Sequence, residues 1–230
     1  DPLPAVVDEA IETGVDMVIT PHPLFLRGTD HVSATPSKGR SVHRLIRAGI
    51  ALANAHTSWD SAAGGVADAL AAAVGLTRTV VLSPSQADPE LGIGRVGELA
   101  EPTTLRAFAQ TVATVLPDCV PGLLVGGDLD AQVSRIAVSG GSGDSLLGAA
   151  RAAGADVFVT ADLRHHPATD HLAEGRPFLL CGTHWATEWV GLPPLATRLE
   201  AEAAAQGRRL TAQVSCVVTD AWTLRLSTGA

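Results

Sequence analysis

Two short segments place a histidine and an acidic residue four positions apart. In "NAHTSWDSAAGG" His56 precedes Asp60, and in "THWATEWVG" His184 precedes Glu188. If a helix begins at each histidine, the imidazole and the carboxylate lie on the same helix face. Imidazole and carboxylate groups are the ligands that Zn²⁺, Mn²⁺ and Fe²⁺ take in proteins. The paired spacing therefore indicates metal binding.

A third histidine follows another apolar segment. His22 lies in "PHP", directly after "DMVIT". In open α/β sheets, ligands collect beyond the carboxyl ends of the strands, and each of these histidines follows an expected strand. A two-metal centre, with bridging carboxylates and completing waters, requires about this many ligands. The candidate ligands are His22, His56, Asp60, His184 and Glu188.

Each motif also has a plainer interpretation when it is taken alone. Asp60 would be an acid in the first turn of a helix, where the helix dipole favours it, and His22 would be a turn residue between two prolines. The coincidence of two matching motifs with a third histidine favours the metal site. His31, His43 and His171 have no such partner pattern, and we interpret them as surface or structural residues.

The segments that must position these residues alternate between helical and extended patterns, which indicates an α/β fold with helices layered on a largely parallel or mixed sheet. Helices are expected over Pro4–Gly14, Ser41–Ala48, Ser61–Val74, Thr103–Leu116, Ser142–Ala153, Arg164–Ala173 and Trp185–Gln206, the last interrupted at Pro193 and Pro194. Strands are expected over Asp16–Thr20, Gly49–Ala55, Thr79–Leu82, Arg135–Ser139, Asp156–Thr160, Arg176–Gly182 and Ala212–Val218, with a loop over Ser83–Leu99.

Two parts of the sequence look like copies of each other. "TGVDMVIT" (Thr13–Thr20) matches "AGADVFVT" (Ala153–Thr160), and in both a helix ends at glycine, aspartate follows, and a strand ends at threonine. The next expected strand in each copy leads into a histidine–acid motif. We therefore predict two duplicated α/β halves, residues 1–125 and 126–230, with a metal cleft between them.

Two glycine-rich motifs are weaker candidates. "GIGRVG" (Gly92–Gly97) fits the dinucleotide-binding pattern, but it follows a turn-rich loop rather than a strand, which disfavours a Rossmann-type oxidoreductase. "SGGSGDS" (Ser139–Ser145) follows a strand and opens a helix, so it either holds an anion on free backbone N–H groups or makes a tight turn. The absence of a P-loop lysine favours the turn.

Composition excludes several classes of protein. Of the 230 residues 46% are apolar and 17% charged, which is typical of a globular protein. A net charge of -8 without a basic patch argues against nucleic acid as a partner. Three cysteines without a CxxC motif predict a reducing, cytoplasmic setting. No apolar run is long enough for a membrane span, so no membrane is expected. Met17 is the only methionine, and we expect residues upstream of Asp1.

The chain resembles the NIF3 family of dinuclear-metal proteins, which are often labelled GTP cyclohydrolase 1 type 2 homologues. The resembling segments, in the family's order, are "DMVITPHPLF", "NAHTSWDSAAGGVADAL", "GIGRVGEL", "SGGSGDSLL", "GADVFVTADLRHHPA" and "GTHWATE". The resemblance implies two intertwined, duplicated α/β halves with mixed sheets and a toroidal homohexamer. It also implies two divalent metal ions between the halves, and nitrogen and oxygen ligands suit Zn, Mn, Fe and Ni nearly equally.

Carried over residue by residue, the resemblance assigns the metal ligands to His22, His56, Asp60, His184 and Glu188. It places His166 at the edge of the site, and His166 or Asp162 is a candidate for proton transfer. The family usually has His-His-Pro where this chain has Pro21-His22-Pro23, so one expected ligand is absent and the second metal position is expected to be weak or empty. The family's N-terminal strand and helix are also missing from this sequence.

Two functions are compatible with this pattern. The first is a metal-dependent hydrolase that acts on a nucleotide or another phosphate-containing small molecule, with GTP cyclohydrolase type 2-like chemistry implied by the resemblance. Metal ions in such enzymes lower the pKa of a bound water and polarise a substrate oxygen. The alternative is a non-catalytic, oligomeric metal-binding scaffold or regulatory protein. In both cases other copies of the chain are the expected partners.

Overall fold

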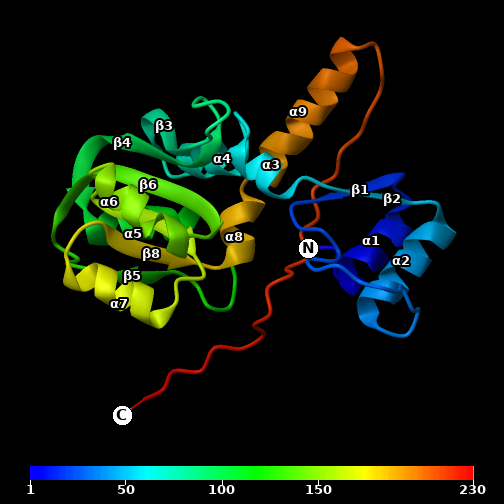
Figure 1. The fold of residues 1–230 in the computed structure, drawn as a ribbon, viewed down its shortest axis with the longest axis horizontal. Coiled ribbons are helices and arrows are strands. Elements are labelled where there is room, and N and C mark those ends of the chain that lie inside the picture. Colours follow the sequence, from blue (N-terminus) through cyan, green and yellow to red (C-terminus); the bar gives the residue numbers. More distant parts are fainter. Residues whose placement is uncertain (230) are drawn as a thin grey trace. The chain divides into compact units, whose positions relative to one another are not determined.

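The computed structural model describes residues 1–229 and shows a mixed α/β fold (Figure 1). The chain divides into two compact units. Unit 1 comprises Asp1–Trp59 and Ser215–Thr219, and unit 2 comprises Asp60–Val214 together with a segment that starts at Asp220. The predicted division into halves 1–125 and 126–230 concerns the duplication of the sequence, and it stays a prediction.

Unit 1 is built on a two-stranded parallel sheet. Strand β1 (Met17–Thr20) pairs with β2 (Ala51–Asn54), and helix α2 (Ser37–Ala48) makes the connection between them. Helix α1 (Pro4–Thr13) precedes β1. Parallel strands need such a crossover because the end of one strand and the start of the next lie at opposite edges of the sheet. The core of this unit contains Val7, Ala10, Leu45 and Ile50.

Unit 2 is built on a six-stranded mixed sheet with the strand order β3-β4-β6-β7-β8-β5. The strands are β3 (Thr77–Pro84), β4 (Gly92–Thr104), β5 (Leu124–Gly126), β6 (Gln132–Ser142), β7 (Val157–Ala161) and β8 (Phe178–Gly182). The neighbours β6, β7 and β8 are parallel, and the other pairings are antiparallel. The carboxyl ends of β6, β7 and β8 therefore lie at the same edge of the sheet.

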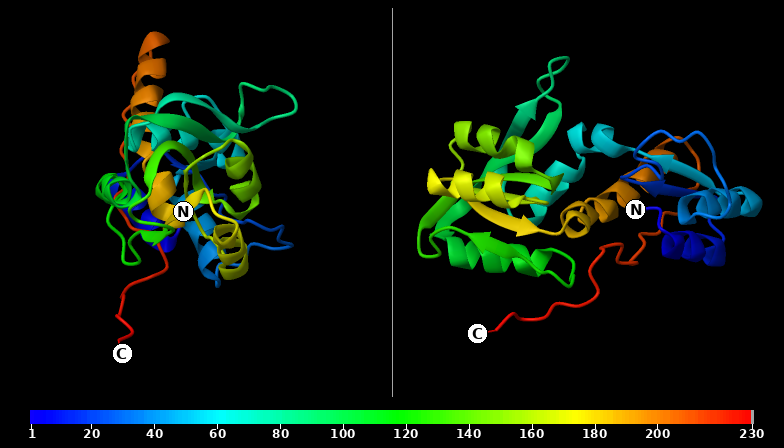
Figure 2. Two further views of the ribbon diagram at one scale, coloured as in Figure 1. Left: turned by 90° about the vertical axis from the view of Figure 1, so that its left-hand side faces the viewer. Right: turned by 60° about the horizontal axis from the view of Figure 1, so that its bottom comes forward.

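Helices cover both faces of this sheet. They are α4 (Val66–Ala73), α5 (Leu105–Val115), the 3-10 helix η1 (Asp144–Leu146), α6 (Leu147–Ala152), α7 (His165–Ala173) and α8 (His184–Trp189). Helix α9 (Leu192–Ala205) follows α8, and none of its residues is buried. Ile136 and Val138 pack with α4 and α5, whereas Ala137 between them packs with α6. This alternation is what a strand buried on both faces requires. Figure 2 shows α5, in green, and α6, in yellow-green, on opposite sides of the sheet.

None of the helices within residues 1–229 combines the length and the apolar composition needed to cross a bilayer.

The predicted α/β fold is confirmed, and most predicted elements occur within a few residues of their expected bounds. Two expectations are wrong. Ser83–Leu99 is not a loop throughout, because β4 begins at Gly92 and pairs with β3 on one side and β6 on the other. The glycines of "GIGRVG" hide this strand from a periodicity argument. Residues 212–218, all within the described part of the chain, contain no strand, although their apolar residues suggested one.

Two element boundaries and one further strand also differ from expectation. The predicted helix Ser61–Val74 is interrupted near its start, because Ser61 is the last residue of α3 (His56–Ser61) and α4 begins only after Gly64 and Gly65. The helix expected over Trp185–Gln206 breaks at Gly191 rather than at the proline pair. Those prolines occupy the first turn of α9, where a missing N–H costs no intrahelical hydrogen bond. The short strand β5 was not predicted.

The two sequence copies have the same local structure. In one, α1, β1, α2, β2 and α3 follow each other, and in the other α6, β7, α7, β8 and α8 do so. The carbonyl of Asp16 accepts a hydrogen bond from the N–H of Ala51 (3.0 Å), and the carbonyl of Asp156 accepts one from Phe178 (2.8 Å). In both copies the six-residue helix that ends the series begins at the predicted metal-binding histidine. This agreement supports a duplication.

His171 in α7 is buried and held in one tautomer. Its Nε2 donates to the carbonyl oxygen of Pro177 (2.9 Å), and Nδ1 accepts from Nη2 of Arg151 (3.1 Å). A second proton on Nδ1 would face the guanidinium group. Burial is the largest cause that lowers the pKa of His171 below its ordinary 6.5. The histidine is therefore structural, in agreement with the sequence-based interpretation.

We expect the free energy of unfolding to fall as the pH drops below 6.5. The unfolded chain takes up a proton on His171 near that pH, whereas the folded chain resists it, so acid favours unfolding by up to about 1.4 kcal/mol per pH unit. The difference between wild type and His171→Gln in urea unfolding at pH 7.5 and pH 5.0 measures this effect, because contributions from other groups are common to both proteins. His171→Gln should lose this pH dependence of the free energy of unfolding, whereas the control His31→Gln, at an exposed position, should keep it. The same pH dependence in the two variants would refute the assignment.

Candidate metal site

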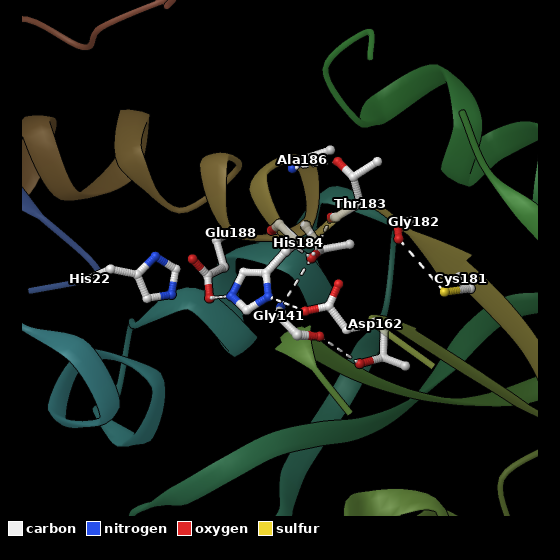
Figure 3. A network of polar contacts seen from close by, with 12 residues as sticks. His22, Gly141, Asp162, Cys181, Gly182, Thr183, His184, Ala186 and Glu188 are labelled. Carbon is white, nitrogen blue, oxygen red and sulfur yellow. Dashed lines mark hydrogen bonds and ion pairs between the residues drawn. The ribbon is translucent and has the colours of Figure 1, made fainter. Parts of the chain in front are cut away.

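The predicted pair His184 and Glu188 lies in α8, which follows β8 and begins at His184. Thr183 caps this helix, because its Oγ1 accepts a hydrogen bond from the N–H of Ala186 (3.2 Å). With the helix begun at His184, the two side chains lie one turn apart. The Nε2 atom of His184 is 2.9 Å from Oε1 of Glu188 (Figure 3). The structure thus brings together these two predicted ligands.

Asp162 holds the other nitrogen of the same imidazole ring. It follows β7, the neighbour of β8, and its Oδ2 lies 2.6 Å from Nδ1 of His184. Its backbone has a φ of 52°, a left-handed conformation that is rare for residues other than glycine. Histidine ligands of metals usually donate their second N–H to such a carboxylate, which fixes the ring. This contact gives Asp162 an orienting role, and its predicted part in proton transfer stays a prediction.

Gly141 at the end of β6 leaves open the space beside both ligand atoms. Its N–H donates to Oγ1 of Thr187 (3.0 Å), and its carbonyl accepts from Oγ1 of Thr160 (3.0 Å). Its φ is 67°. A Cβ atom at this position would lie 2.6 Å from Oε1 of Glu188 and 2.9 Å from Nε2 of His184. Only glycine provides both the conformation and the space.

The electrostatics of the site favour a cation. Glu188 is 9% exposed, so its carboxylate is largely removed from water. The hydrogen bond to Glu188, with a further contribution from Asp162, raises the pKa of His184 to about 9, although burial opposes this shift. The metal-free imidazole therefore holds a proton on each nitrogen, each facing a carboxylate. A divalent ion would take the place of the proton between His184 and Glu188, and the residues present fit such an ion.

The other predicted ligands are placed by the strand ends of unit 1 and by α3. His22 lies in the turn after β1, where Oγ1 of Thr20 donates to its carbonyl (2.7 Å). Its Nδ1 is 3.0 Å from Oδ1 of Asp1. The rings of His22 and His56 meet edge to face, with centroids 5.2 Å apart. Asp60 follows His56 by one turn within α3.

His166 occupies the first turn of α7 and is exposed. Its ring meets that of His165 edge to face, with centroids 5.0 Å apart. Its predicted place at the edge of the site and its part in proton transfer stay predictions. By contrast, Gly141, Thr183 and Thr187 support the site and were not predicted to do so. The sequence indicated only a turn or an anion site for "SGGSGDS". Its contact with α8 joins residues far apart in the chain, and residue spacing cannot predict such a contact.

Comparisons with known proteins agree with this geometry. A family model described as Duf34/NIF3 (NGG1p interacting factor 3) matches residues 1–221. A Streptomyces coelicolor protein named GTP cyclohydrolase 1 type 2 homolog is 48% identical over 229 residues, which cover 99% of this chain and 80% of that protein. A Mycobacterium tuberculosis protein of the same name is 31% identical, with 100% and 87% covered.

A solved structure confirms the fold. A crystal structure of a Bacillus cereus protein related to NIF3 has a TM-score of 0.89 and is 24% identical, with 98% of this chain and 87% of that chain covered. At that identity the likeness concerns the fold alone.

Proposed function

The chain belongs to the Duf34/NIF3 family, and from that premise we propose that it is a metal-dependent hydrolase acting on a nucleotide or another phosphate-containing small molecule. The observation that carries the proposal is the His184–Glu188 pair, with Nε2 and Oε1 2.9 Å apart and Asp162 on Nδ1. The name that the relatives carry makes GTP the first substrate to test.

In the proposed site, His184 and Glu188 hold a divalent ion. Asp162 keeps the proton of the imidazole on Nδ1, which leaves the lone pair of Nε2 for the ion. We propose His22, His56 and Asp60 as the further ligands, on the strength of the sequence motifs. An ion held there would supply a water of lowered pKa and polarise a substrate oxygen. The carboxylate of Glu188 is largely buried, and the ring of His184 is fixed by its contacts. Both ligand atoms therefore keep their positions while the substrate reacts.

We further propose that Zn, Mn, Fe or Ni fills the site and that occupancy lies closer to one ion per chain than to two. Pro21 stands where the family pattern has another histidine, and the loss of a protein ligand weakens one position. A homo-oligomeric ring, which the family resemblance implies, is the proposed assembly, and the cysteine pattern makes the cytoplasm its proposed setting.

We expect the purified protein to retain a divalent metal and His184→Ala to lose it by at least about 100-fold in affinity, since both a ligand and the partner of Glu188 are removed. The fold should survive, because His184 is one-third exposed at the start of a short helix. Elemental analysis and circular dichroism report these two results. His31→Ala is the matched control, and metal retained by His184→Ala at wild-type level would refute the proposed site.

Metal binding should also depend on pH. Because the pKa of His184 is raised to about 9, binding at pH 7 must release its proton, and the apparent affinity should rise up to about tenfold per pH unit until pH 9. Titration calorimetry in buffers of different ionisation enthalpy counts the released protons. By the same linkage, the metal-free protein loses stability as the pH rises from 6.5 to 9.

Turnover needs its own test, because a metal site alone also suits a binding protein. Metal-loaded and chelator-stripped protein should be assayed with GTP and with simple phosphodiesters. Hydrolysis that depends on the metal supports the enzyme. Bound metal without turnover of any of them would favour the non-catalytic oligomeric scaffold.

A further inference from the structure

A shallow cavity of about 500 Å³ opens in unit 2 at the carboxyl ends of β6 and β7. Its lining residues are Ser142, Asp144, Ser145, Asp162, Arg164 and Pro167. They come from the end of β6, from η1, from the residues after β7 and from the first turn of α7. The carboxyl edge of parallel strands is where α/β proteins place their ligands.

Both carboxylates in this cavity are engaged by neighbouring groups. Asp144 accepts from the backbone N–H of Arg164 (3.2 Å) and forms an ion pair with the Nε of the same residue. Asp162 accepts from Nδ1 of His184 (2.6 Å). Their negative charges are therefore balanced by groups of the protein itself, which reduces their repulsion of an anionic ligand.

The remaining polar groups of the cavity are donors. Because Asp144 holds Arg164 at Nε, the terminal nitrogens of the guanidinium are available to a ligand, and the side chain is 77% exposed. The hydroxyl groups of Ser142 and Ser145 belong to exposed residues on the same rim. A guanidinium with two hydroxyl donors is a set that recognises phosphate, whose oxygens accept several hydrogen bonds at once.

We propose that this cavity binds the phosphate group of the substrate, with Arg164, Ser142 and Ser145 as its ligands. The inference rests on the proposed function, because Asp162 both lines the cavity and holds the metal-binding His184. A phosphate bound to Arg164 would thus leave the rest of the substrate next to the proposed metal ligands. The volume exceeds that of a phosphate and suits a nucleotide-sized molecule.

The test uses the metal-free chain, because a bound metal ion would itself bind phosphate. Chelator-treated protein should be titrated with inorganic phosphate, GMP, guanosine and acetate by calorimetry. We expect GMP to bind more tightly than phosphate, and both to bind more tightly than guanosine or acetate. Arg164→Gln should weaken GMP binding at least about tenfold, because it removes a charge-assisted hydrogen bond. Ser145→Ala should weaken it several-fold.

Arg106→Gln is the matched control, since Arg106 is an exposed arginine of the same unit with a loose ion pair, 4.0 Å from Asp130. It should bind GMP as the wild type does. Arg164→Lys should restore part of the affinity, and thermal unfolding of each variant shows whether it folds. The proposal is overturned if Arg164→Gln and Ser145→Ala bind like wild type, if guanosine binds as well as GMP, or if phosphate binds only to metal-loaded protein. None of these outcomes touches the metal site, which His184→Ala tests separately.

Discussion

Gly141→Ala is expected to abolish metal retention while the protein stays folded. The added methyl carbon would lie 2.6 Å from Oε1 of Glu188 and 2.9 Å from Nε2 of His184. Both distances are shorter than a van der Waals contact, so the two ligand atoms must move away. They are the ends of side chains rather than backbone, and the fold can therefore tolerate the movement. A metal ion requires its ligand atoms within a few tenths of an ångström, and the affinity should fall by more than about 100-fold.

The control for this variant is Gly154→Ala. Gly154 has a φ of 68°, almost the same as the 67° of Gly141, but a Cβ atom there would meet nothing within 4 Å. Both substitutions therefore cost about 1 kcal/mol for the left-handed backbone, and only one of them reaches the ligands. Elemental analysis together with urea unfolding separates the two effects. Equal metal content in the two variants would show that Gly141 serves the backbone alone.

Some parts of the site can be predicted from the sequence, and others cannot. The spacing of His184 and Glu188 predicted a shared helix face, and the structure places their atoms 2.9 Å apart. This prediction succeeds because the period of a helix fixes the geometry of residues four apart. The contacts of Gly141 and Asp162 with the same ligands join distant parts of the chain. No periodicity encodes them, and they become visible only after β6, β7 and β8 are aligned.

The strands of the fold also differ in how well the sequence predicts them. Strands such as β7, a continuous apolar run flanked by turn residues, are evident in the sequence. Strand β4 is not, because the glycines of "GIGRVG" resemble a loop. The structure gives a packing reason for one of them: a Cβ atom at Gly97 would lie 2.8 Å from the carbonyl oxygen of Thr77 on the adjacent strand. The glycines of this motif therefore serve strand packing, and the dinucleotide-binding alternative has no structural support.

Arg95, the arginine of "GIGRVG", is the residue for which we expect the second large effect, a loss of stability. Arg95 is 4% exposed, and its guanidinium donates to both carboxylate oxygens of Asp68, at 2.6 Å and 2.9 Å. It also donates to the carbonyl oxygens of Gly92 and Gly94, each at 2.8 Å, and to that of Ala62 at 3.3 Å. One buried side chain thus ties β4 to α4 and to the connection between α3 and α4.

Arg95→Ala is therefore expected to lower the free energy of unfolding by about 3–5 kcal/mol, because it leaves Asp68 as a partly buried charge without its partner and several carbonyl groups without a donor. Arg106→Ala, which breaks an exposed pair with Asp130, should cost less than about 1 kcal/mol. Urea unfolding of the metal-free variants measures both values, and similar values would contradict the buried-pair argument.

The double variant Arg95→Met with Asp68→Asn sharpens the cause. It removes both charges, keeps most of the volume, and retains an oxygen that can accept from the N–H of Gly64, as Asp68 does at 2.7 Å. If the cost of Arg95→Ala comes from the stranded carboxylate, the double variant should be more stable than Arg95→Met alone. If the loss of stability comes instead from the carbonyl groups that lose their donor, the double variant and Arg95→Met should have the same free energy of unfolding. Because Ala62 follows the helix that carries Asp60, metal content measured on the same variants shows whether this anchor also holds a proposed ligand in place.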